Sequence, residues 1–185
     1  MRKGLLVTTV LAASTLLLAS CAKTVSYEDA KKHIETNFTS TEEKMFDFED
    51  VTKVTEVDGV FKLAGLEVGE KTDTGKGKRG VIKAQSLELF GDKATYKVDG
   101  KKLSAEHNLD VRTYLKEAYK QDVPENAQIS GKVFAKVSTD DEGYIVKEYY
   151  KVENLEFSYN SDLGVAVTGK LSMESTVTYT ARPAN

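Results

Sequence analysis

The clearest pattern in the chain is a regular alternation of apolar and polar residues near its C-terminus. From residue 165 to residue 182 one parity is mostly apolar and the other is polar. An alternation of period two predicts a β-strand with one buried face. A straight strand of this length would overrun a domain of this size, so we expect it to bend, with Gly169 and Ser175 as the natural places.

A second long strand is predicted just before it, over residues 144–159. Its apolar parity changes from even positions, such as Val152, to odd positions, such as Leu155. One extra residue near Glu153–Asn154 explains this change, so the sequence predicts a β-bulge there. Residues 129–137 also alternate, and the glycines of segments 140–143 and 160–164 indicate turns between the strands.

The first half of the body is less regular. Spaced apolar pairs predict three strands between residues 45 and 90, at Phe46 and Phe48, at Phe61 and Leu63, and at Leu87 and Leu89. Segment 69–77 is glycine-rich, but its glycine spacing and Gly77 do not fit a phosphate-binding loop, so we expect a flexible loop.

A hairpin is predicted over residues 94–105. Asp99–Gly100 is a favoured pair for a two-residue turn, and centring the turn on it places Tyr96 opposite Leu103.

Two helices are predicted in the chain. Segment 26–29 has the pattern of a capping box, and apolar residues follow it at helical spacing as far as Phe38. The second helix is expected over Asn108–Gln121, capped by Asn108 or Asp110 and ended by Pro124. The predicted class is α+β: a curved, mostly antiparallel, half-barrel-like sheet with one N-terminal and one internal helix covering its concave face.

The N-terminus has the layout of a secretory signal peptide. Arg2 and Lys3 precede an uncharged apolar run, which is short for a stable membrane span and ends in small residues. Leu18-Ala19-Ser20-Cys21 then resembles the bacterial lipobox at every position. The resemblance implies that the Cys21 thiol receives diacylglycerol and that the chain is cut before it. An ordinary signal peptide cleaved elsewhere is the alternative.

This resemblance implies three segments. Residues 1–20 are the lipoprotein signal peptide, residues 21–25 are the lipidated cysteine with a short tether, and residues 26–185 are a single β-rich domain. The protein is then expected on the extracytoplasmic side of a bacterial membrane, held by its lipid. The domain pattern also loosely resembles lipoprotein carriers of the LolA and LprG type, which implies a lipid-binding cavity under the curved sheet. No motif carries this second resemblance, so it transfers no ligand-binding residue.

Composition narrows the chemistry. The net charge of −3 and the pI near 5.6 give no basic field for nucleic acid. One cysteine excludes an internal disulfide, and two histidines make a histidine-rich metal site improbable. We therefore expect no metal and no cofactor, and because the usual hydrolase motif G-x-S-x-G is missing, we assign no catalytic residue.

Weaker candidates have ordinary alternatives. His33 or His107 could meet a serine and an aspartate, but a solvated or helix-end histidine is the default. Lys76, Lys78 and Arg79 could bind a phosphate group, or simply lie in a solvated loop. Five tyrosines of the C-terminal strands could line a lipid cavity or pack as in any sheet: Tyr144, Tyr149, Tyr150, Tyr159 and Tyr179.

Three functions fit these observations. The leading one is a non-enzymatic, lipid-anchored binding protein that holds an apolar or lipid ligand against the concave sheet. The second is a structural, adhesive or assembly lipoprotein that binds another envelope protein. The third is a cell-envelope hydrolase, which requires a cleft where a histidine meets a serine and an aspartate.

Overall fold

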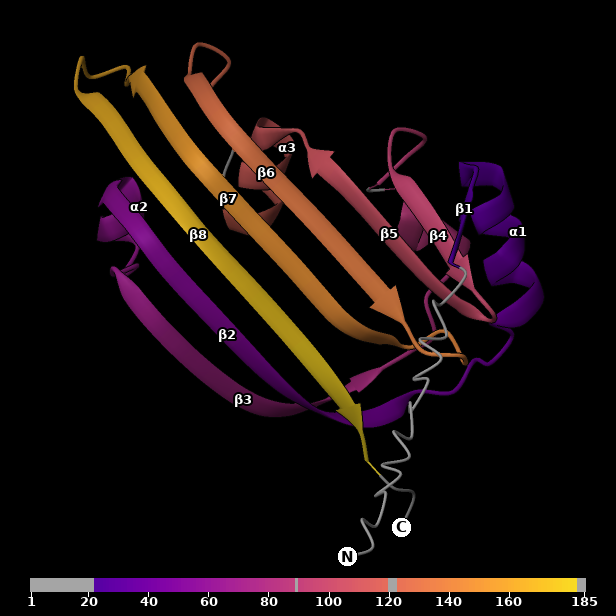
Figure 1. Ribbon diagram of the computed structural model, residues 1–185. Coiled ribbons are helices and arrows are strands. Elements are labelled where there is room, and N and C mark those ends of the chain that lie inside the picture. The colour runs from indigo at the N-terminus through magenta and orange to yellow at the C-terminus, as the bar shows by residue number, and fades with distance from the viewer. Residues whose placement is uncertain (1–21, 89, 120–122, 183–185) are drawn as a thin grey trace, which may run out of the picture.

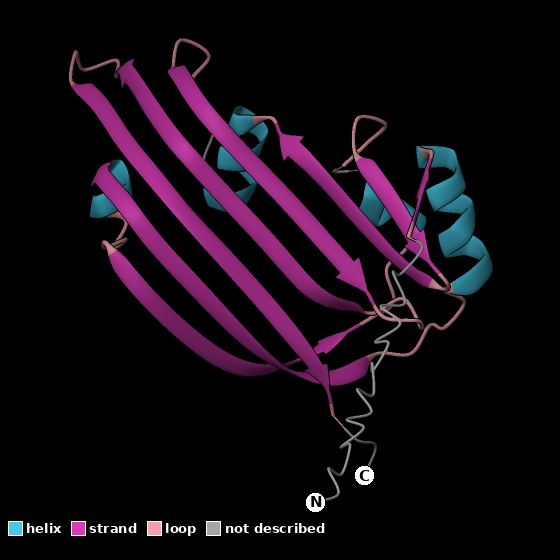
Figure 2. Cartoon of the chain, in the orientation of Figure 1, coloured by secondary structure: helices cyan, strands magenta, loops and turns pink. Residues whose placement is uncertain are grey.

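A strongly curved antiparallel sheet organises the described part of the molecule (Figure 1). The structure is a computed structural model and describes residues 22–88, 90–119 and 123–182. Its eight described strands follow the order β1-β4-β5-β6-β7-β8-β2-β3, and the helices are few and short (Figure 2). The α+β class and the curved antiparallel sheet predicted from the sequence are confirmed.

The elements are bounded as follows. The strands are β1 (Lys23–Val25), β2 (Lys44–Gly59), β3 (Gly69–Arg79), β4 (Thr95–Asp99), β5 (Lys102–Leu109), β6 (Gln128–Thr139), β7 (Ile145–Asn160) and β8 (Ala166–Ala181). The helices are α1 (Tyr27–Asn37), α2 (Val60–Leu63), the 3-10 helix η1 (Ala84–Leu87) and α3 (Val111–Tyr119).

The predicted β-bulge lies where the phase of the sequence changes. The pairing of β7 with β8 shifts register between Val152 and Leu155, and Asn154 has a φ of 48°. Across the neighbouring ladder, β6 shifts register at Gly131, whose φ is 109°. The extra residues let apolar side chains on both sides of the bulge face the same side of the sheet and add to its curvature.

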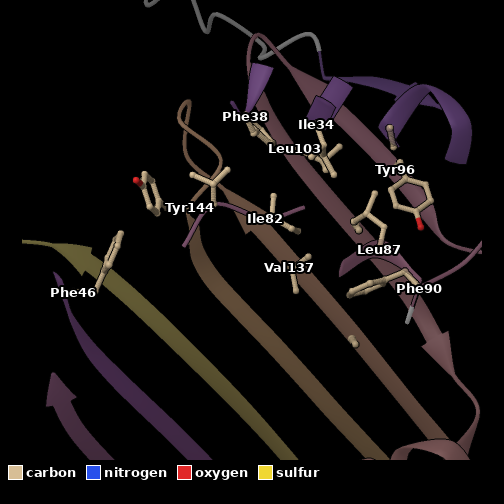
Figure 3. Packing of buried hydrophobic residues seen from close by; sticks show 14 residues of the cluster. Ile34, Phe38, Phe46, Ile82, Leu87, Phe90, Tyr96, Leu103, Val137 and Tyr144 are labelled. Carbon is tan, nitrogen blue, oxygen red and sulfur yellow. The ribbon is translucent and has the colours of Figure 1, made fainter. Parts of the chain in front are cut away.

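Two hydrophobic clusters fill the two ends of the concave face. At one end α1 and the segment after β3 pack on β4, β5 and β6, with Ile34, Leu87 and Tyr96 among the buried residues (Figure 3). At the other end Phe61 of α2 and Leu115 of α3 pack on inward residues of β2, β6, β7 and β8. Both predicted helices therefore cover the concave face, and α3 lies behind β6 and β7 in Figure 1.

A crossing segment closes the end of the sheet that carries α1. After β3 the chain passes to the start of β7, where Val81 pairs with Tyr144 and the Ile82 amide donates to the Gly143 carbonyl at 2.9 Å. The Tyr144 hydroxyl donates to the Glu42 carbonyl at 3.0 Å, and its ring lies 5.6 Å from that of Phe46. These contacts tie the two sides of the curved sheet together.

Two of the three strands predicted between residues 45 and 90 are wrong. Phe48 lies in β2 as expected, but Phe61 lies in the short helix α2 and Leu87 in η1, while Leu89 is outside the described residues. Two apolar residues at positions i and i+2 fit a strand, yet they also fit a single buried helical turn. Phe61 and Leu87 are both buried.

The loop predicted over residues 69–77 is also wrong. These residues belong to β3, which pairs with β2 from Gly69 opposite Val54 to Arg79 opposite Lys44. The glycines suit this strand because the Phe48 ring lies over Gly75, where an added Cβ would come within 2.4 Å of the ring. The partner strand, rather than an apolar pattern, makes this segment extended.

The hairpin is confirmed, but its turn is centred one residue later in the sequence than predicted. Asp99 pairs with Lys102 and Tyr96 pairs with Ala105 rather than Leu103, so the central turn residues are Gly100 and Lys101. Only the first of these has a positive φ, 61° at Gly100, which fits a type II′ turn. Tyr96 and Leu103 still share one face.

The predicted cap of the first helix is confirmed, because Ser26 accepts a hydrogen bond from the Asp29 amide at the start of α1. The helix α3 starts later than predicted, because Asn108 still belongs to β5.

The predicted tether is partly wrong. Residues 23–25, expected as tether, form strand β1 and pair with β4. Cys21 lies outside the described residues.

Candidate binding site on the concave face

A cavity of about 570 Å³ separates the two hydrophobic clusters. Four strands and the beginning of α3 contribute its walls. The lining residues are Asp50 and Thr52 of β2, His107 and Leu109 of β5, Asp110, Thr113 and Tyr114 around the start of α3, Tyr150 of β7, and Met173 and Ser175 of β8.

The strand register explains why space is left here. One lateral row of the sheet runs from His107 through Ala135, Tyr150 and Ser175 to Thr52. Two of these inward side chains, Ala135 and Ser175, are small, so they leave space above this part of the sheet. The next row towards α3 carries larger apolar side chains, including Met173, which form a higher wall.

Asp50 provides a fixed negative charge in the wall of the cavity. Its Oδ1 accepts hydrogen bonds from Thr52 Oγ1 and from Ser175 Oγ, both at 3.0 Å. Ser175 is buried, so its hydroxyl donates its hydrogen bond to this carboxylate rather than to water. The two hydroxyls therefore orient a carboxylate that lies on the inward side of β2.

An ion pair beside the cavity closes the curve of the sheet. The Arg79 guanidinium of β3 lies 2.9 Å from Glu148 of β7 and stacks 3.5 Å above the Tyr179 ring. Strands β2 and β8 lie between β3 and β7, so only a tightly curled sheet brings these groups together. Burial raises the pKa of the Tyr179 hydroxyl, and the Glu148 carboxylate raises it further.

The remaining walls are apolar or aromatic. Leu109, Tyr114 and Met173 line the side nearer α3, and Tyr150 stands in the middle of the row. Burial is the main cause that raises the pKa of the Tyr150 hydroxyl, followed by the nearby Glu148 carboxylate. The cavity therefore combines apolar surface with one oriented carboxylate and tyrosine rings.

Asp110 holds the beginning of α3 over the cavity. Its Oδ1 accepts from the Thr113 amide at 2.8 Å and from the Thr113 hydroxyl at 2.9 Å. The amide hydrogen bond is the largest cause that lowers the pKa of Asp110, and the hydroxyl bond adds to it. The aspartate predicted as a helix cap is confirmed.

Replacing Asp110 by alanine is expected to lower the free energy of unfolding by about 1 kcal/mol at neutral pH, because the first turn of α3 loses its cap. A carboxyl with a lowered folded-state pKa stabilises the fold above its ordinary pKa of 3.8 and loses this effect as the pH falls through the lower folded value. Urea unfolding of both proteins between pH 7 and pH 3 should show the difference shrinking at the acid end. A difference that grows towards pH 3 would contradict this role.

A second cavity, lined almost entirely by apolar residues, lies at the end of the sheet that carries α2. It has a volume of about 390 Å³ and is lined mainly by side chains of α2, α3, β7 and β8, among them Phe61, Leu115 and Phe157. Leu63 and Leu163 beside this end are about nine-tenths exposed, and Val165 is also exposed. This end of the molecule therefore presents apolar side chains to its surroundings.

The two histidines lie in different parts of the fold. His33 Nε2 donates to the Lys101 carbonyl at 2.8 Å, and the ring lies edge-on to Phe38, so it joins α1 to the β4–β5 turn. His107 lines the same cavity as Asp50 and Ser175. However, three strand spacings separate His107 from Ser175, about 14 Å along the sheet. Within the described residues no hydrogen bond joins them, so a Ser–His pair is not assembled here.

The other candidates are also separated. Lys76 and Lys78 have the opposite parity to Arg79 along β3, so their side chains lie on the convex face of the sheet while that of Arg79 lies on the concave face. The three cations therefore do not form one site. Of the five tyrosines, Tyr144 is buried in the cluster near α1, Tyr150 lines the cavity beside Asp50, Tyr159 lines the second cavity near α2, and Tyr179 packs against Arg79. Tyr149 faces outward and packs on Phe134.

Sequence reasoning missed the carboxylate of this cavity. Asp50 and Thr52 share the parity of Phe46 and Phe48, which the alternation assigns to the buried face. A charged residue at an inward position of a strand is the available signal, because such residues are rarely buried without a partner.

Comparisons with known proteins give no relative. No family model matches the chain, and no curated protein or solved structure that was compared with it does so. Among the described residues, no group of three or more histidine, cysteine or acidic side chains is arranged to hold a metal ion. In the same residues, no helix has the length and apolar character needed to cross a membrane.

Proposed function

We propose that this protein is a membrane-anchored extracytoplasmic lipoprotein that binds, without catalysis, a ligand with an apolar body in the cavity of its concave face. The sequence supports the anchor, through the lipobox-like segment that ends at Cys21. The cavity between the two hydrophobic clusters is the observation that carries the binding function. Its volume lies within the range of about 300–1,000 Å³ typical of small-molecule sites.

The position of β1 adds an orientation. Lys23 pairs with Val98 beside the β4–β5 turn, at the end of the sheet opposite to α2 and the β7–β8 turn (Figure 1). One residue, Ala22, lies between Cys21 and Lys23, so the two residue steps give a reach of about 7 Å. A lipid on Cys21 would hold the domain by this end, with the apolar end near Leu163 pointing away from the bilayer.

The binding function is tested on the domain from residue 22 to residue 185, because both hydrophobic clusters are built from residues within it. Organic extraction and mass spectrometry should recover a copurifying ligand, or the domain should bind the neutral fluorescent probe N-phenyl-1-naphthylamine. Ser175→Leu should weaken probe binding at least about tenfold by filling the cavity. Thr176→Leu, on the outward face of β8, should not change it. A wild-type domain that yields no ligand and binds no probe would remove the binding function.

The anchor is tested separately in living cells. Radioactive palmitate should label the full chain expressed in a bacterium, and the labelled protein should sediment with membranes. Cys21→Ser should abolish both the label and the sedimentation. Equal labelling of the Cys21→Ser chain would overturn the lipoprotein assignment.

A protein partner is a second candidate function, favoured by the exposed apolar residues Leu63, Leu163 and Val165. Contiguous exposed apolar surface often marks an interaction site. A photo-crosslinking residue at position 163 should then capture one stoichiometric membrane protein in cells. The same residue at position 156, on the polar outward face of β7, should not.

A further inference from the structure

We propose that the cavity selects organic cations, namely ligands that carry a primary or quaternary ammonium group on an apolar body. This inference rests on the proposed binding function and names the chemistry of its ligand. The carrying observation is the carboxylate of Asp50, oriented on the inward face of β2 beside tyrosine rings and apolar side chains.

Asp50 presents one occupied oxygen and one available oxygen. Both hydroxyl donors, Thr52 and Ser175, point at Oδ1. In the described part of the chain no donor is placed on Oδ2. A primary ammonium group would donate a charge-assisted hydrogen bond to this oxygen, which is stronger than a neutral hydrogen bond, whereas a quaternary ammonium group has no N–H and would be attracted by the charge alone.

The protein's own cations nearby are paired elsewhere. Arg79 is held by Glu148 at 2.9 Å and by the Tyr179 ring, and Lys71 of β3 lies 2.9 Å from Asp73. Asp73 is the main partner that raises the pKa of Lys71, and Asp50 is the weakest contributor to that shift. The charge of Asp50 is therefore not neutralised by an ion pair within 4 Å among the described residues.

The other walls favour the same ligand class. Asp110 adds a second negative charge at the start of α3, although Thr113 already donates to it. Tyr114 and Tyr150 bring aromatic rings to the lining, and such rings attract ammonium groups through their negative faces. A carboxylate ligand would meet like charge, while Leu109 and Met173 offer apolar contact to the ligand body.

Three ligands with the same decyl chain separate the head group from the apolar body: decylammonium, decanoate and decanol. Their affinities for the domain from residue 22 to residue 185 are measured by displacement of N-phenyl-1-naphthylamine, below micelle-forming concentrations. We expect decylammonium to bind at least about tenfold more tightly than decanol, and decanoate to bind least. Asp50→Asn, which keeps an oxygen for Thr52 and Ser175, should remove the preference for decylammonium.

The matched control is Glu49→Gln. It removes one negative charge from the neighbouring residue of β2, whose side chain is exposed on the other face, so it should keep the preference. Equal binding of the three ligands to the wild-type domain would overturn the cation inference and leave the proposed binding function standing. A preference that survives Asp50→Asn would also overturn it. Failure of all three ligands to displace a bound probe would overturn the cation inference alone, whereas a domain that yields no ligand and binds no probe would overturn both. The ranking of the three ligands is measured on the wild-type domain, so it does not depend on the folding of a variant.

Discussion

Tyr144→Ala is expected to lower the free energy of unfolding by about 4 kcal/mol, the cost of truncating a fully buried aromatic side chain. Tyr144 has no exposed surface and lies where the crossing segment meets the start of β7. Its ring contacts Phe46, and the Lys44 ammonium lies 4.7 Å from the ring centre. Urea unfolding followed by circular dichroism measures the change.

Tyr144→Phe is the control for this prediction. It keeps the ring and loses only the hydrogen bond to the Glu42 carbonyl, so we expect a cost of about 1 kcal/mol. If the alanine variant were as stable as the phenylalanine variant, the ring would not hold the crossing segment against the sheet.

Gly131→Ala is expected to cost about 3 kcal/mol, because strain and steric overlap act at the same residue. Its φ of 109° is unfavourable for any side chain. An added Cβ would lie 2.6 Å from the Leu155 Cα and 2.7 Å from the Asn154 carbonyl oxygen. These are backbone atoms of the neighbouring bulge, which cannot rotate away, so β6 and β7 would have to separate locally. Thermal and urea unfolding both report the loss.

Gly77→Ala provides the matched comparison. Gly77 also lies in a strand, but its φ is outside the positive range and nothing lies within 4 Å of an added Cβ. Alanine should leave stability unchanged or raise it by about 0.5 kcal/mol, since the unfolded chain loses freedom. Equal destabilisation at both positions would mean that the close approach of the Asn154–Leu155 backbone is not the reason for a glycine at position 131.

The long C-terminal strands and their bulge could be predicted because alternation is a property of the sequence itself. Leu171 and Ser175 share the buried parity of β8, and the phase change at Asn154 marks the extra residue. Helix starts were equally readable, since Ser26 and Asp110 accept hydrogen bonds from amides three residues ahead.

Other elements depend on partners far away in sequence. Strand β3 has no apolar pattern and is extended because β2 supplies its hydrogen bonds. The cavity combines residues of β2, β5, β7 and β8, and only the register of the ladders places Asp50 beside Ser175. A single sequence gives the parity of each residue but not its lateral neighbour, so the cavity could not be assembled from the sequence.

The two outer strands of the sheet have a consequence for crowding. At one border β1 is three residues long, and at the other β3 carries Lys71, Lys76 and Lys78 along its length. The unpaired N–H and C=O groups of an edge strand can pair with a strand of another chain. A short edge strand and lysine side chains along an edge strand both oppose this pairing. Copies concentrated side by side on one surface would thus resist merging into continuous ribbons and remain separate molecules.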